Sequence, residues 1–431
     1  MSTITPVVDD PTRDYGDKVV AVEPGGVEAI PLDERHGRPL GLFWTWTSPN
    51  MEFATIAVGF LGPLFFGLTF WQTVWAIVLG TALGSITHGV LSTWGPEYGL
   101  PQMVLSRSGF GFLGNVLPAG INAVVAGIGW FAVNSVSGAL ALNALIHAPK
   151  WLCLVIVVAA QIIIAFFGHN LVHAFERLAF PVLTVIFVVA CIVVLSKAHP
   201  SAVHGGGGIG GFLILFGASF GYAVGWNPYA SDYTRYLPPN TRRLPIALAA
   251  GFGVFLSCVL LEVAGAAVVT ATKVTDVNPS FFTNLLPTWL GKLTLLAICL
   301  GAVAANALNI YSGSMSFMAL GVRLPTHWAR AAVALLFGLV GFFVALAGLH
   351  NAGKTYENFL LVISYWIAPW LGVVLVDRFL RRRTDRTSLL AERNNTNWAG
   401  PIAMAISMAV SIWLFSNQTE YVGVIPKHHP A

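Results

Sequence analysis

The chain has 431 residues, of which 56% are hydrophobic and only 10% are charged, and its mean hydropathy is +0.72. A water-soluble fold of this size could not bury so much apolar surface, so a soluble enzyme, a disordered scaffold and a nucleic-acid-binding protein are excluded. The apolar stretches are long and continuous, which predicts an all-α polytopic membrane protein whose surroundings are a lipid bilayer.

In chain order, a polar segment at 1–40 predicts a disordered cytosolic tail, and apolar runs long enough to cross a bilayer follow it. Eleven helices are expected, at 41–66, 70–93, 113–146, 151–168, 171–196, 209–236, 244–271, 291–319, 328–348, 356–379 and 397–416. With the N-terminus in the cytosol, every arginine falls on the cytosolic side and the outer loops carry only lysines, as expected for a multi-pass protein of the cytoplasmic membrane.

Two of these spans carry proline and glycine where a continuous helix would be interrupted. The first contains Ser48-Pro49-Asn50, and the sixth contains Gly225 followed by Asn227-Pro228. Proline removes a backbone hydrogen bond from a helix, and inside a bilayer the freed groups must face protein, a cavity or a ligand. Both spans are therefore expected to be broken within the membrane.

Polar positions in other spans repeat at the spacing of the two breaks. Pro49 and Gly225 lie 176 residues apart, and so do Trp130 of the third span and Asn306 of the eighth. Five spans per unit is an odd number, so the offset predicts two units inverted in the membrane, as in secondary transporters. Chance is the alternative, because membrane helices tolerate glycine and proline. The expected parts are the tail at 1–40, repeats at 41–196 and 197–379, and a basic cytosolic loop with an eleventh helix at 380–431.

The broken spans and the spans that face them are expected to form a binding site at the midplane. Amides donate and accept hydrogen bonds, so they suit a planar ligand whose edge alternates the two, and indole rings stack on a flat π-face. The absence of lysine and arginine favours a neutral heteroaromatic ligand. Core packing of the tryptophans and helix–helix hydrogen bonding of the asparagines are the alternatives. The expected lining residues are Ser48, Asn50, Trp130, Asn134, Gly225, Trp226, Asn306 and Asn309.

Acidic residues inside spans are costly and are candidates for carrying a coupling proton. Glu262 stands in mid-span, Glu52 follows the first break, and Glu176 opens the fifth span beside Arg177. The alternatives are a protonated, hydrogen-bonded structural acid for Glu262 and a salt bridge to Arg177 for Glu176. The sequence has no nucleophile–base pair, metal-spacing cluster or phosphate-binding loop, so no enzyme activity, cofactor or metal site is expected. It gives no basis for predicting an oligomer.

The segment Gly225–Pro238, which begins Gly-Trp-Asn-Pro-Tyr-Ala, resembles the helix-6 signature of purine–cytosine permeases in the nucleobase:cation symporter-1 family. Stretches at 30–37, 130–134 and 306–312 support the resemblance, which spans about 30–425. It implies a leucine-transporter-type fold with two inverted five-helix repeats (helices 1–5 and 6–10), alternating access and nucleobase import. It also implies stacking of the base on Trp226, with Trp130 on its other face, hydrogen bonds from Asn134 and Asn309, substrate contact at Ser48, and a functionally linked acid at Glu176.

Two departures from the family pattern affect these expectations. Sodium-coupled relatives carry hydroxyl side chains on helix 8 where this chain has Gly301–Ala305, so we expect a proton as the coupling ion and keep sodium as the alternative. Members usually have twelve spans, so the twelfth is expected to be missing here. A symporter for another neutral heterocycle, such as a hydantoin, allantoin or a thiamine precursor, remains open. A channel is disfavoured because the sequence shows breaks rather than a continuous polar stripe.

Overall fold

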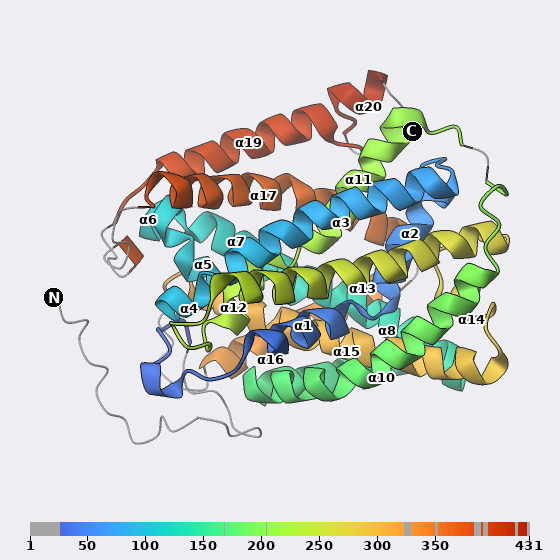
Figure 1. Ribbon diagram of the computed structural model, residues 1–431, viewed down its shortest axis with the longest axis horizontal. Helices are drawn as coiled ribbons and strands as arrows, with labels where there is room; N and C mark the ends of the chain where they lie inside the picture. Colours follow the sequence, from blue (N-terminus) through green and yellow to red (C-terminus); the bar gives the residue numbers. More distant parts are fainter. Residues whose placement is uncertain are drawn as a thin grey trace.

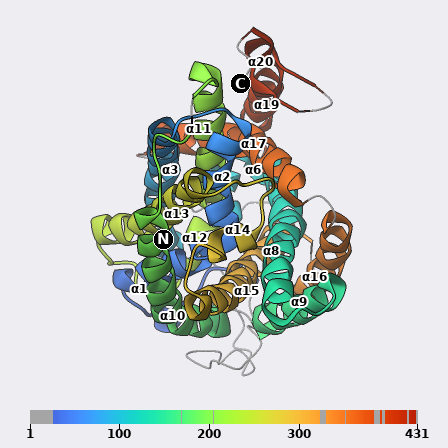
Figure 2. The same cartoon turned by 90° about the vertical axis from the view of Figure 1, so that its right-hand side faces the viewer.

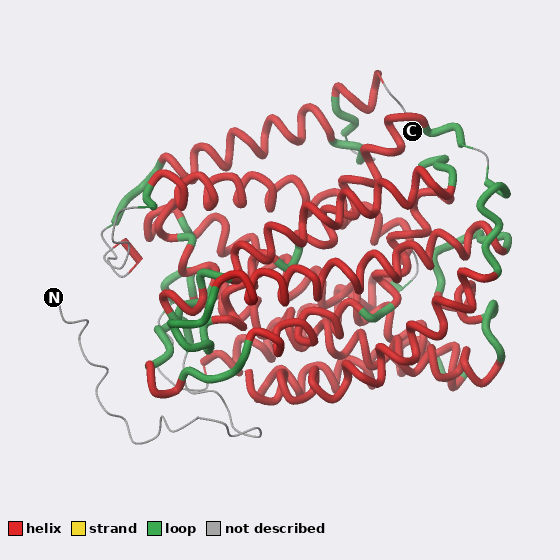
Figure 3. The backbone as a smooth tube through the Cα atoms, viewed as in Figure 1, coloured by secondary structure: helices red, strands yellow, loops and turns green. Residues whose placement is uncertain are grey.

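The computed structural model describes residues 26–428 apart from 168, 204, 323–328, 350–351, 383–388, 391–394 and 419–420. Within these residues the chain is helical, and the long helices run roughly along the longest axis of the molecule (Figure 1). Figure 3 shows the same path as helices joined by loops, without strands in the described part. This architecture agrees with the predicted all-α polytopic class.

The first and sixth spans are both interrupted, as predicted. Helix α1 (Pro39–Thr47) runs into a 3-10 turn at Ser48–Asn50, and two residues separate that turn from α2 (Phe53–Phe65). Helix α11 (Gly208–Val224) is followed by a 3-10 turn at Asn227–Tyr229 and by the short α12 (Ala230–Thr234). A proline is the second residue of each turn, and because it has no N–H it cannot continue the hydrogen bonds of the preceding helix.

The other predicted spans are present as helices, with one irregularity. The third span consists of α6 (Arg107–Gly114), α7 (Val116–Val124), a π-helical turn at Val125–Trp130 and α8 (Phe131–Ile146). Such π-helical turns are often found at functional sites. The remaining long helices are α3 (Phe70–Ser92), α9 (Lys150–Phe167), α10 (His169–Ser196), α13 (Arg243–Ala271), α15 (Thr288–Met318), α16 (Ala329–Gly348), α17 (Ala352–Leu380) and α19 (Ala399–Phe415).

Short helices close the two ends of the bundle. The loop after α3 forms α4 (Gly95–Tyr98) and α5 (Gln102–Leu105), which lie with α12 at the left end of Figure 1. There the Gln102 backbone N–H donates to Asp232 Oδ1 at 2.8 Å, which ties the loop to the sixth span. Other short helices are a 3-10 turn at Leu32–Glu34, α14 (Pro279–Thr283) and α20 (Val424–His428).

Close helix crossings bring the first broken span against the bundle. A Cβ at Gly59 of α2 would lie 1.7 Å from the Glu262 carbonyl oxygen, and one at Gly265 of α13 would lie 1.9 Å from the Ile56 carbonyl oxygen. Small residues allow such approach where lipid supplies no hydrophobic drive for helix association. Seen along the bundle in Figure 2, α2 and α15 run inside, with α9, α10, α16 and α19 towards the outside.

The outer surface is that of a membrane protein. Large apolar side chains such as Trp71, Ile86, Phe343 and Trp413 are exposed on the outer faces of the helices. Among the described residues, six helices are long and apolar enough to cross a bilayer, and five more are apolar but shorter than 18 residues. One of the shorter ones, Phe53–Phe65 (α2), is the second half of the interrupted first span.

Candidate functional site

A small cavity lies between the two broken spans and the two spans that face them. Its lining is mixed aromatic and polar. Five of the eight residues expected at a midplane site line it, whereas Ser48, Asn50 and Asn306 lie outside its wall. The lining residues are Glu52, Trp130, Asn134, Tyr222, Gly225, Trp226 and Asn309.

Residues at the first break hold the Trp226 indole in place. Its Nε1 donates to Asn50 Oδ1 at 2.8 Å, and Asn50 Nδ2 donates in turn to the Trp46 carbonyl at 2.6 Å. The Trp46 ring also packs edge-on against Trp226, with the ring centroids 5.7 Å apart. Asn50, which we expected to contact a ligand, is therefore placed to orient the Trp226 ring.

The Trp130 indole is held by two aromatic neighbours and faces a glycine. Its ring makes edge-to-face contacts with Tyr222 and Phe359, at centroid distances of 5.5 and 5.0 Å. A Cβ at Gly225 would lie 3.2 Å from Trp130 Cζ2, which is tighter than ordinary contact. The bare backbone at Gly225 thus lets the sixth span approach the indole closely.

The two cavity asparagines share one hydrogen-bonding partner, Asn306. Asn134 Nδ2 and Asn309 Nδ2 donate to Asn306 Oδ1 at 3.1 and 3.2 Å. This leaves Asn134 Oδ1 and Asn309 Oδ1 buried with no hydrogen-bond partner among the described residues. Buried polar groups in native proteins are nearly always paired, so two free acceptors at one cavity indicate a ligand that carries donors.

Glu52 adds a third acceptor to the same cavity. Its side chain is buried beside the Tyr222 hydroxyl, and Glu52 Oε2 has no partner among the described residues. Tyr222 in turn contacts Thr55 Oγ1 at 2.6 Å, and Thr55 donates to the Asn50 carbonyl. The cavity therefore combines two indoles, three unpaired acceptors and no cationic side chain in its lining, which suits a flat, uncharged ring with N–H donors on its edge.

Residues 29–429 match the family described as permeases for cytosine/purines, uracil, thiamine and allantoin. The chain belongs to this family. A putative purine-cytosine permease of Bacillus subtilis is 29% identical over 420 residues, which cover 94% of this chain and 91% of the relative. A purine-cytosine permease of Saccharomyces cerevisiae is 29% identical over 439 residues, covering 94% and 80%.

A solved structure shares the fold of this permease. It is a nucleobase-cation-symport-1 family transporter in a closed conformation with bromovinylhydantoin bound, and it aligns with a TM-score of 0.75 at 21% identity. The alignment covers 91% of this chain and 90% of that one. The expected leucine-transporter-type fold is confirmed, and the permease is a secondary transporter of nucleobases or related heterocycles rather than an enzyme.

The three acids proposed for proton coupling occupy different places in the permease. Glu52 lines the cavity. Glu262 is buried on α13 away from the cavity lining, where it accepts a hydrogen bond from Thr81 Oγ1 at 3.3 Å. The side chain of Glu176 lies outside the part of the chain that the structure describes. Ser48 is buried, and its Oγ has no partner among the described residues.

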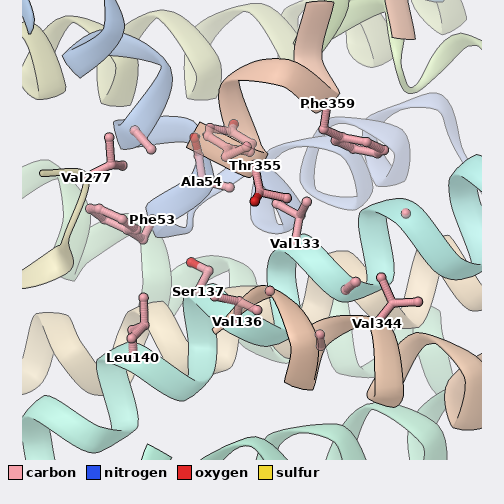
Figure 4. Close-up of a pocket in the computed structure, with 16 residues that line it drawn as sticks. Phe53, Ala54, Val133, Val136, Ser137, Leu140, Val277, Val344, Thr355 and Phe359 are labelled. Carbon is pink, nitrogen blue, oxygen red and sulfur yellow. Dashed lines mark hydrogen bonds between the residues drawn. The ribbon is translucent and has the colours of Figure 1, made fainter. Parts of the chain in front are cut away.

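A second, larger chamber adjoins the Trp130 side of the permease site. It lies between α2, α8, α16 and α17, as Figure 4 shows through residues such as Phe53, Ser137 and Phe359. The chamber is mainly apolar, and the Phe359 ring separates it from the Trp130 indole. Tyr356, also in its wall, donates to the Ala54 carbonyl at 2.7 Å and so joins α17 to α2.

Tyr222 is the cavity residue that the sequence reasoning missed. It lies on α11, three residues before Gly225 and four before Trp226, and residues at this spacing share a helix face. That spacing could have revealed it.

Proposed function

We propose that this permease imports a neutral nucleobase, cytosine or a purine, by proton symport across the cytoplasmic membrane. The main support for the proposal is the cavity, whose lining combines Trp130 and Trp226 with three residues that each carry a buried acceptor without a partner among the described residues. A flat base would stack on the indoles and donate its N–H groups to those oxygens. Anionic substrates are disfavoured, since the lining has no lysine or arginine to balance their charge.

Glu52 is the favoured carrier of the coupled proton. It is the cavity acid, so its protonation state acts directly on the bound base: a neutral carboxyl group donates a hydrogen bond, whereas a carboxylate only accepts. Sodium is disfavoured at the neighbouring part of α15, where Gly301 packs against the first break. A Cβ at Gly301 would lie 2.1 Å from the Met51 carbonyl oxygen, and Gly301–Ala305 offers no hydroxyl ligand.

Alternating access would connect the cavity first to one side and then to the other. The arginine distribution favours a cytosolic N-terminus, which places the chamber beside Phe359 on the outer side. We propose that a base enters through this chamber and that the first half of α17 covers it, with the Tyr356–Ala54 hydrogen bond formed in the covered state.

Uptake of radiolabelled cytosine tests the substrate class. Cells or proteoliposomes with the permease should accumulate cytosine, and unlabelled adenine or hypoxanthine should compete if purines share the site. The other named substrates of the family, uracil, thiamine and allantoin, are tested in the same competition. Accumulation of one of these without any uptake or competition by cytosine or a purine would contradict the proposed substrate.

The variant Glu52→Gln tests the coupling. It preserves the shape of the side chain but cannot release a proton, so accumulation driven by a pH gradient should be lost while exchange of labelled for unlabelled base persists. Glu262→Gln is the matched control, because Glu262 is an equally buried acid away from the cavity. Loss of coupling in Glu262→Gln alone, or accumulation that requires sodium and ignores the pH gradient, would refute the assignment to Glu52.

A further inference from the structure

We infer that Asn306 is a positioning residue that sets the hydrogen-bonding polarity of the cavity and thereby its preference for bases with an amino group. The inference rests on the proposed function and deepens it. Asn306 is not among the residues that line the cavity, and both polar atoms of its side chain make hydrogen bonds within the protein. It can therefore act on a ligand only through its neighbours.

The orientation of the Asn306 amide is fixed by a backbone carbonyl. Its nitrogen lies 2.8 Å from the Phe131 carbonyl oxygen, and because a carbonyl accepts but never donates, that atom must be Nδ2. The same Nδ2 lies 3.1 Å from Ser135 Oγ. The Asn306 oxygen must then point the other way, towards the cavity asparagines.

This orientation propagates to the cavity. An oxygen at the Asn306 position requires donors from its neighbours, so Asn134 and Asn309 both turn their nitrogens to it. Their own oxygens consequently face away from Asn306 and have no protein partner among the described residues. The cavity therefore presents amide acceptors, which match an exocyclic amino group or a ring N–H and mismatch a carbonyl.

A second backbone carbonyl supports the network from α9. Gln161 Nε2 donates to the Ala302 carbonyl at 3.1 Å, which leaves Gln161 Oε1 to receive the Ser135 hydroxyl at 2.8 Å. The Ser135 hydroxyl also lies 2.7 Å from the Phe131 carbonyl oxygen, and because both of these partners can only accept, Ser135 Oγ is left to accept a hydrogen bond from Asn306. The backbone carbonyls of Phe131 and Ala302 can only accept, so they fix which way the Asn306 and Gln161 amides point.

The test compares cytosine with uracil, which has a carbonyl oxygen where cytosine has its amino group. The measured quantity is the ratio of the inhibition constants of uracil and cytosine, obtained by competition against labelled substrate binding or uptake. The unsubstituted permease should bind cytosine more tightly. In Asn306→Leu the freed amides can rotate and offer their nitrogens, so cytosine binding should weaken about tenfold or more and the ratio should fall by a similar factor.

Two further variants separate positioning from general damage. Asn306→Asp, when protonated, keeps the acceptor for both amides and a donor for Phe131, so it should retain the uracil-to-cytosine ratio within about threefold. Asn122→Leu is the matched control, because it removes another buried hydrogen bond between the third and eighth spans, from Asn122 Nδ2 to Ser316 Oγ at 2.8 Å, outside the cavity lining. Its ratio should not change.

Failure of the inference and failure of the proposed function give different results. If the unsubstituted permease takes up neither cytosine nor a purine, the proposed function is wrong. If it takes up these bases but prefers uracil to cytosine, or if Asn306→Leu keeps the original ratio, the positioning role is wrong. Asn306→Ala is read in the same way if Asn306→Leu does not reach the membrane.

Discussion

The contact between Gly301 and the first break gives a sharp prediction about the variant Gly301→Ala. The added Cβ would lie 2.1 Å from the Met51 carbonyl oxygen and 2.9 Å from Glu52 Cβ. Ordinary contact begins at about 3.4 Å, so α15 and the break would have to separate by roughly 1 Å. Overpacking of this kind costs about 1–3 kcal/mol, which for a chain of this length lowers the melting temperature by about 1–3 °C. Because the separation also displaces Glu52, uptake driven by the pH gradient should fall clearly even though the melting temperature falls by only a few degrees.

The assay is thermal unfolding of the purified permease together with uptake of labelled cytosine driven by a pH gradient. The matched control is Gly372→Ala on α17, where a Cβ would meet nothing within 4 Å and the gain in helix propensity is free of a clash. We expect Gly372→Ala to match the unsubstituted permease in uptake. A Gly301→Ala permease with unchanged melting temperature and unchanged uptake would refute the reasoning that α15 fixes the break by direct contact.

Three more predictions concern the cavity. Trp226→Ala should weaken base binding about 5- to 150-fold through lost stacking, and Trp226→Phe should weaken it less; equal losses in a binding assay would argue against stacking. Asn309→Ala should abolish cytosine uptake while the protein still reaches the membrane, since an unpaired polar group on the base costs about 1–3 kcal/mol, and normal uptake would remove Asn309 from the site. Asn50→Ala frees the Trp226 indole without removing it, so its binding loss should be smaller than that of Trp226→Ala; a larger loss would mean that Asn50 contacts the base itself.

The positions of the two helix breaks could be read from the sequence because their cause is local. The turns at Ser48–Asn50 and Asn227–Tyr229 each contain a proline, which cannot donate a backbone hydrogen bond wherever the chain goes, although Pro63 and Pro369 lie inside continuous helices. The irregular third span has no comparable local signal. The sequence predicts plain helix over its π-helical turn at Val125–Trp130. Such a turn inserts one extra residue into a helix, and packing rather than residue type stabilises the insertion.

The sequence alone determined that this is a polytopic helical membrane protein with two interrupted spans and a cluster of amides and indoles, because composition, periodicity and proline act without reference to distant residues. The tertiary structure decided which of those side chains reach the cavity. Asn306 and Asn309 are one turn apart and looked equivalent, but the rotation of α15 against α8 turns one towards Phe131 and the other into the cavity. Rotation of a helix is set by its neighbours, and contacts between Gly301 and Met51 or between Asn306 and Phe131 join residues far apart in the chain.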